Sequence, residues 1–98
     1  MPASAVRRLE WAPRALHAYL NSLAHIADQD PRTAELVRER VEHTLDLILE
    51  HPGIGVPTAR RGERRYPIAN TGYVIVYRVT PVAVRVHVWY RARRNVRR

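Results

Sequence analysis

The chain has 98 residues, no cysteine, and 17 basic residues, all of them arginine, against nine acids, which gives a formal net charge of +8. This length predicts one domain over residues 1–98, and the missing thiols exclude disulfides and thiolate zinc sites. No stretch reaches the roughly 20 apolar residues of a membrane span and the N-terminus lacks a signal-peptide core, so we expect a cytoplasmic protein without membrane contact.

The first half of the chain predicts a short strand and then two helices. Residues 6–11 have β character, and Pro13 suits the first turn of a helix. This helix runs to about Ala27, and its apolar face holds Leu16, Tyr19, Leu20, Leu23 and Ile26. Asp30 and Pro31 are typical of the start of a second helix, with an apolar face of Ala34, Val37, Val41, Leu45 and Ile48. The short connection predicts an antiparallel helical hairpin.

The second half predicts strands. A proline- and glycine-rich loop covers residues 51–63, and strands follow over residues 64–69, 73–80 and 82–90. Residues 73–80 are apolar on both faces, which indicates a central strand, while Pro67 indicates an edge or an irregularity. Residues 91–98 form a basic tail that we expect to be frayed. The layout β-α-α-β-β-β predicts an α+β fold, with the helical hairpin on one face of a mostly antiparallel four-stranded sheet.

Charge is divided unequally between the two halves. Residues 60–98 hold eleven arginines and one acid, Glu63, for a charge of +10, whereas residues 1–59 hold six arginines and eight acids, for −2. On the last strand a period of two places Val82, Val84, Val86 and Val88 on one side, and Arg85, His87 and Trp89 on the other. We expect the valine side to meet the helices. The other side would then offer a basic, aromatic surface to an anionic partner.

Five segments carry a family resemblance, and they occur in a fixed order. They are Trp11-Ala12-Pro13-Arg14-Ala15, Glu50-His51-Pro52-Gly53-Ile54-Gly55, Gly62-Glu63-Arg64-Arg65-Tyr66-Pro67-Ile68, Tyr73-Val74-Ile75-Val76-Tyr77-Arg78-Val79 and Val88-Trp89-Tyr90-Arg91-Ala92-Arg93. In this order and spacing the chain resembles the RelE/ParE superfamily of toxins from type II toxin–antitoxin systems. The resemblance covers nearly the whole chain.

The resemblance implies a toxin that a cognate antitoxin neutralises in a hetero-oligomer. It leaves the target open, because RelE-like members cleave messenger RNA on the ribosome whereas ParE-like members poison DNA gyrase. The Arg-Arg-x-Pro pattern at residues 64–67 looks ParE-like, and the lysines and the C-terminal tyrosine of RelE-like members have no equivalent here. The ParE-like branch is therefore favoured, and with it a toxin that binds its target and is not an enzyme. A ribosome-dependent endoribonuclease and a non-toxic protein or nucleic-acid binding module remain alternatives.

Candidate binding residues lie on the last strands and in the tail. Arg64 and Arg65 are neighbours on one strand and so point to opposite faces, and one of them could grip a carboxylate or a phosphate. His87 has the chemistry of a general acid or base, although a lone exposed histidine is more often inert. The residues expected to bind the target or the antitoxin are Arg64, Arg65, Arg85, His87, Trp89, Tyr90, Arg91, Arg93 and Arg94.

No catalytic residue, metal ligand or cofactor is assigned from the sequence. The other four histidines lack the spacing of a metal site, and the glycines at positions 53 and 55 are explained by chain reversal. Tyr73 and Tyr77 share a face and are expected in the core.

Overall fold

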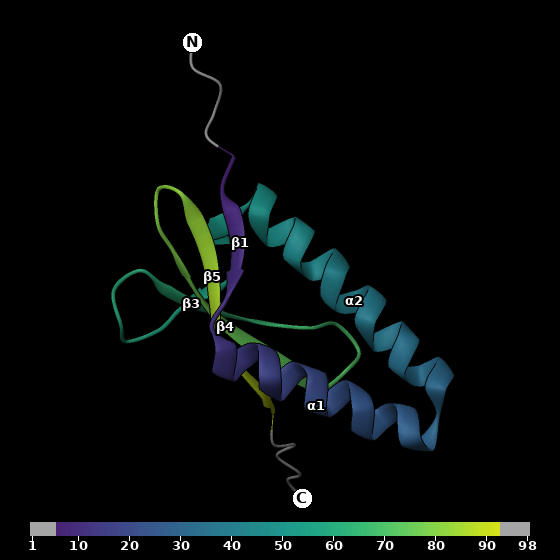
Figure 1. The fold of residues 1–98 in the computed structure, drawn as a ribbon. Coiled ribbons are helices and arrows are strands. Elements are labelled where there is room, and N and C mark those ends of the chain that lie inside the picture. Colours follow the sequence, from purple (N-terminus) through teal and green to yellow (C-terminus); the bar gives the residue numbers. More distant parts are fainter. Residues whose placement is uncertain (1–5, 93–98) are drawn as a thin grey trace, which may run out of the picture.

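The computed structural model describes residues 6–92, which form two helices packed on one face of a five-stranded sheet (Figure 1). The elements follow the chain as β1 (Arg8–Trp11), α1 (Pro13–Gln29), α2 (Pro31–Glu50), a short 3₁₀ turn (Pro52–Ile54), β2 (Val56–Pro57), β3 (Glu63–Pro67), β4 (Tyr73–Val79) and β5 (Ala83–Arg91). The predicted α+β class and the helical hairpin are confirmed.

The sheet has the strand order β1-β5-β4-β3-β2. β1 runs parallel to β5, with Leu9 opposite Val84, and every other neighbouring pair is antiparallel. The sequence predicted four strands, and the fifth, β2, is a two-residue segment inside the predicted loop that pairs with Arg64 and Arg65. Because β2 is so short, β3 is an edge strand at Pro67, as the proline indicated.

The two helices begin at the residues that the sequence singled out, and α1 ends at Gln29, two residues beyond the predicted Ala27. Pro13 is the first residue of α1, and Asp30 caps α2. One carboxylate oxygen of Asp30 accepts a hydrogen bond from the Arg32 amide at 3.1 Å, and the other accepts one from the Thr33 hydroxyl at 2.8 Å. Both hydrogen bonds lower the pKa of the Asp30 carboxyl, and the bond from Thr33 has the larger effect.

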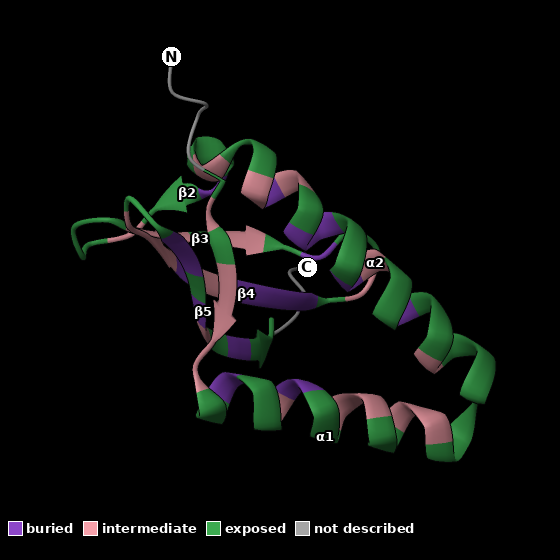
Figure 2. Cartoon of the chain, turned by 45° about the horizontal axis from the view of Figure 1, so that its top comes forward, coloured by how far each residue is buried: buried purple, intermediate pink, exposed green. Residues whose placement is uncertain are grey.

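The core lies between the sheet and the near halves of the helices (Figure 2). α1 buries Ala15 and Tyr19, both in its first half, and α2 buries mainly residues of its second half, so the far end of the hairpin extends past the sheet. The predicted α1 face is wrong in part, because Leu16 is 38% and Leu20 is 51% exposed. α1 contacts β5 through Tyr19. At 100° per residue, Leu16 and Leu20 lie to one side of Tyr19 around the helix and are therefore exposed to solvent.

β4 is the central strand that the sequence predicted. It is flanked by β5 and β3, and Tyr73, Ile75 and Tyr77 on its helix-facing side are buried. The sheet has a helix-facing side and an open side, and successive residues of a regular strand point to one and then the other.

Candidate target-binding surface

The neighbours Arg64 and Arg65 occupy opposite sides of β3, as predicted, and their environments differ. Arg64 lies on the helix-facing side, where its guanidinium donates to the carbonyl oxygens of Gly53 at 3.1 Å and Gly55 at 2.7 Å. Arg65 is exposed on the open side, between Val56 of β2 and Val76 of β4. Arg64 therefore holds the loop that leads into β2, and Arg65 is the member of the pair that a partner can reach.

Tyr77 of β4 also holds the loop that leads into β2. Its buried hydroxyl donates to the Pro52 carbonyl at 2.8 Å and accepts from the Gly55 amide at 3.0 Å, and burial raises the pKa of this phenol. A Cβ at Gly55 would lie 2.7 Å from that hydroxyl and 2.8 Å from the Arg65 carbonyl. Only glycine allows this close approach, which lets β2 join the sheet beside Arg65.

A β-bulge in β5 overturns the predicted side of Trp89. Val76 pairs with Val88 and Tyr77 with Val86, so His87 is an extra residue in β5. Beyond His87 the alternation is reversed, and Trp89 is only 6% exposed, on the helix-facing side. Its ring stacks on Tyr73 and meets Tyr19 edge-on, and its Nε1 donates to the Ser22 hydroxyl at 3.0 Å. Trp89 is a core residue.

The same bulge brings Val88 to the open side, and Val82 is also exposed, so neither valine packs under the helices as predicted. Val84 and Val86 are fully buried, as expected. The open side thus carries a row of apolar side chains that we call the open-face strip. From the pairing register it comprises Val56, Pro67, Val74, Val76, Val88 and Tyr90.

Two exposed side chains stand out on the open side: Tyr90, which belongs to the strip, and Arg65, which lies beside it. Tyr90, at 38% exposure, pairs with Val74, and Arg65 pairs with Val76. Arginine and tyrosine on an apolar ground are the residue types that dominate the energetics of protein interfaces. The open side is accordingly less uniformly basic than the sequence indicated, and it suits a protein partner.

His87 is not a lone exposed histidine, contrary to the prediction. Its Nε2 lies 2.7 Å from Oε2 of Glu63, and the two side chains are 23% and 11% exposed. Glu63 also accepts a hydrogen bond from the Thr58 hydroxyl at 2.6 Å. The Thr58 bond, ahead of the His87 contact, lowers the pKa of the Glu63 carboxyl. The three side chains link the β2–β3 loop to the bulge, and sequence reasoning missed Glu63 because its partner lies 24 residues away.

Arg85 lies on the open side, as predicted, at the end of the sheet opposite Tyr90. Its guanidinium is 3.5 Å from Glu10 of β1, which Arg8 also contacts at 3.2 Å. Because these side chains are exposed, the ion pairs contribute little to folding stability.

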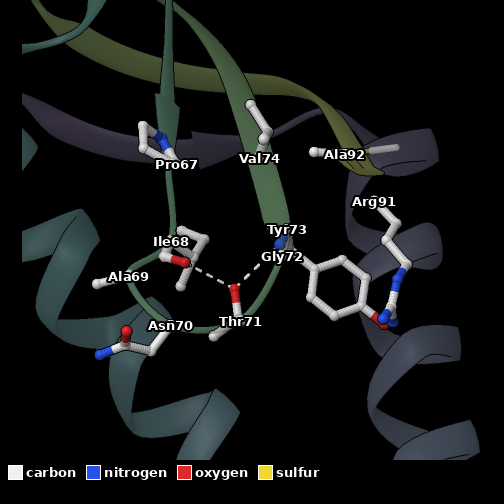
Figure 3. A pocket seen from close by; sticks show the side chains of 10 residues that line it. All are labelled: Pro67, Ile68, Ala69, Asn70, Thr71, Gly72, Tyr73, Val74, Arg91 and Ala92. Carbon is white, nitrogen blue, oxygen red and sulfur yellow. Dashed lines mark hydrogen bonds between the residues drawn. The ribbon is translucent and has the colours of Figure 1, made fainter. Parts of the chain in front are cut away.

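Arg91 is part of β5 and not of a tail. It lies on the helix-facing side, with its guanidinium carbon 5.5 Å from the centre of the Tyr73 ring. Figure 3 shows it at one side of an open hollow of about 1090 Å³ formed with the β3–β4 turn. The Thr71 hydroxyl closes that turn, donating to the Ile68 carbonyl and accepting from the Tyr73 amide. Arg93 and Arg94 lie outside the described residues.

Residues 6–92 contain neither a cluster of metal ligands nor a membrane-spanning helix. No three histidine, aspartate or glutamate side chains come together as a metal site would require. Neither described helix is long and apolar enough to cross a membrane. Assigning Arg65, Arg85, His87, Tyr90 and Arg91 to partner binding stays a prediction.

Comparison with known proteins places the chain. Residues 9–95 match the family described as ParE toxin of type II toxin-antitoxin system, parDE. A protein of Sinorhizobium fredii named "Putative toxin Y4kP" is 31% identical over 74 residues, which cover 76% of this chain and 77% of that protein.

Solved structures share the fold. One of the chromosomal ParDE system from P. aeruginosa superposes with a TM-score of 0.77 at 15% identity, covering 90% of this chain and 98% of that one. The isolated E. coli RelE toxin gives 0.69 at 24% identity, covering 91% and 87%, and the intact E. coli RelBE complex gives 0.68 at 24%, covering 90% and 99%. At these sequence identities the solved structures show only that the fold is shared. The family match over residues 9–95 shows that the chain belongs to the ParE toxins of type II toxin–antitoxin systems.

Proposed function

We propose that this toxin stops bacterial growth by binding DNA gyrase through the open side of its sheet. The observation that carries the proposal is membership of the ParE family, over residues 9–95. The open-face strip supports it, because Arg65 and Tyr90 stand exposed on apolar ground, as anchors of a protein interface do. On this proposal the toxin acts in the cytoplasm and needs no cofactor.

A supercoiling assay tests the target. Purified gyrase and relaxed plasmid are incubated with the toxin, and the expected result is loss of supercoiling. Arg65→Ala should weaken inhibition about tenfold or more, because an interface arginine often contributes more than 1.4 kcal/mol to binding. Arg14→Ala, which removes an exposed arginine from α1, is the matched control. Normal supercoiling at a saturating toxin concentration would rule out gyrase.

We also propose that a cognate antitoxin neutralises the toxin in a hetero-oligomer. The supporting observations are the small core and the excess of arginine in residues 60–98. An acidic, amphipathic segment that orders on binding suits such a surface. The product of the neighbouring gene should form a complex with the toxin, detected by calorimetry and size-exclusion chromatography. No binding at micromolar concentration, with the toxin still monomeric, would contradict the proposal.

Cleavage of messenger RNA on the ribosome is a second candidate, and the Glu63–His87 contact favours it. With Nε2 held by Glu63, the other ring nitrogen of His87 is free to take the proton of a ribose 2′-hydroxyl. The 2′-oxygen then bonds to phosphorus, and the 5′-oxygen leaves with a proton from water. Arginine stabilises the phosphorane charge but does not exchange protons at neutral pH, so we expect cleavage to be weak or absent. Strong cleavage of ribosome-bound message that His87→Ala abolishes would make this the primary function.

A further inference from the structure

Six arginines gather at one end of the sheet, next to the open-face strip but outside it. They lie at the start of β1, on the β2–β3 loop, at the end of β4 and at the start of β5. The β2–β3 loop and the β4–β5 turn project there, away from the far end of the helical hairpin (Figures 1 and 2). We call this group the arginine end; it consists of Arg7, Arg8, Arg60, Arg61, Arg78 and Arg85.

The register brings these strands together. Arg8 is opposite Ala83, Arg85 is opposite both Glu10 and Arg78, and Arg78 is opposite Glu63. Arg7 reaches across to the Thr80 carbonyl at 2.7 Å, and Arg78 to the Arg61 carbonyl at 3.3 Å. The arginine end is thus a continuous surface across β1, β5, β4 and β3.

Acids on these strands neutralise only part of the charge. Six arginines against Glu10 and Glu63 leave +4, and Glu63 is engaged by Thr58 and His87. Within residues 6–92 no carboxylate lies within ion-pair distance of Arg7, Arg60, Arg61 or Arg78. Guanidinium groups left without carboxylates on an exposed rim are suited to phosphate oxygens.

The geometry favours a duplex over a single strand. Single-stranded nucleic acid is held largely by stacking on exposed aromatic rings, and the exposed aromatic of the sheet, Tyr90, lies at the other end. Four neighbouring strands span about 14 Å, close to the width of about 12 Å of the DNA major groove. Arginines at the two sides of this row can therefore reach phosphates on both strands of one duplex.

We propose that the arginine end binds the phosphate backbone of duplex DNA without reading its sequence. This goes beyond the proposed function, because it adds DNA to a protein target and uses residues outside the open-face strip. Contacts of this kind fix position on a duplex and make affinity depend on salt.

Fluorescence anisotropy of a short labelled duplex, titrated with the full-length toxin, tests the proposal. Affinity should fall with salt, with a slope of log K against log salt of about −3 for three or four phosphates. Arg60→Gln/Arg61→Gln should weaken binding about tenfold and make the slope shallower by about 2. The matched control Arg14→Gln/Arg32→Gln removes the same charge from exposed helical positions and should change affinity less than about twofold.

Three results would overturn the proposal. They are equal losses for the two double variants, tighter binding of the single strand than of the duplex, and competition by polyglutamate as effective as that by unlabelled duplex, which would indicate an acidic protein partner. The failure of this proposal can be distinguished from the failure of the gyrase proposal, because Arg65→Ala should weaken gyrase inhibition but leave DNA binding unchanged. Circular dichroism verifies that each variant is folded.

Discussion

The two sides of the sheet use the same residue types for different purposes. On the helix-facing side three side chains form hydrogen bonds within the protein. Arg64 donates to the Gly53 carbonyl, Tyr77 to the Pro52 carbonyl and Trp89 to the Ser22 hydroxyl. On the open side Arg65 and Tyr90 stand exposed. Arg64 and Arg65 are adjacent in sequence, as are Trp89 and Tyr90, so the side of the strand decides whether a residue stabilises the fold or is available to a partner.

The largest contrast is expected between Trp89 and Tyr90. Trp89→Ala should lower the free energy of unfolding by about 3–5 kcal/mol, because it removes a buried ring that packs on Tyr73 and Tyr19. Tyr90→Ala should lower it by at most about 1 kcal/mol. Urea denaturation followed by circular dichroism measures both. Similar losses for the two variants would mean that the sides do not differ.

Tyr77→Phe removes one buried hydroxyl from the helix-facing side and tests how much its hydrogen bonds stabilise the fold. The change leaves the Gly55 amide and the Pro52 carbonyl without their partner. We expect a loss of about 1–3 kcal/mol in unfolding free energy. Tyr66→Phe on β3, whose side chain is only partly buried, is the control and should be nearly silent. An unchanged stability for Tyr77→Phe would show that water replaces the hydroxyl.

The neighbouring arginines should separate stability from toxicity. Arg64→Ala removes two hydrogen bonds to carbonyl oxygens and should cost about 1.5 kcal/mol. Arg65→Ala should change stability by no more than about 0.5 kcal/mol yet reduce growth inhibition. Denaturation curves and a plasmid-borne growth assay give the two readouts. Loss of toxicity from Arg64→Ala alone, at unchanged stability, would place the working surface on the other side of β3.

The smallest expected effect depends on pH. Glu63 has a pKa below its ordinary value of 4.5, chiefly through the Thr58 hydroxyl. Because the folded-state pKa is lowered, the contribution is present above about pH 4.5 and disappears as the pH falls through the folded value. The stability gap between the natural protein and Thr58→Val should therefore narrow in acid. A gap that is constant from pH 7 to about pH 3 would show that this bond does not act through the carboxylate charge.

Much of the fold was accessible from the sequence. The helix start at Pro13, the cap at Asp30 and the central strand β4 follow from local signals, and all three are confirmed. The opposite sides of Arg64 and Arg65 follow from the period of two. What local signals miss is β2, because a two-residue strand depends on Gly55 fitting against Tyr77, which is 22 residues away.

The side of Trp89 could not be predicted from alternation. A period of two assigns sides only while no residue is inserted, and the bulge at His87 changes the phase of everything after it. One cue was available, because tryptophan side chains are highly buried on average. The partnership of His87 with Glu63 carried no such cue, since it is made across β4.

The parallel pairing of β1 with β5 has a consequence for the moment at which the toxin becomes active. Arg7 is joined to Thr80, 73 residues later, so the N-terminal strand has no partner until β5 has been synthesised. At about 5–20 residues per second this delay lasts about 4–15 seconds. Throughout that interval the nascent chain has an incomplete sheet and no finished surface for a target. The open side of the sheet, with whatever surface it offers to a partner, is therefore completed only after β5 has been synthesised and has paired with β1.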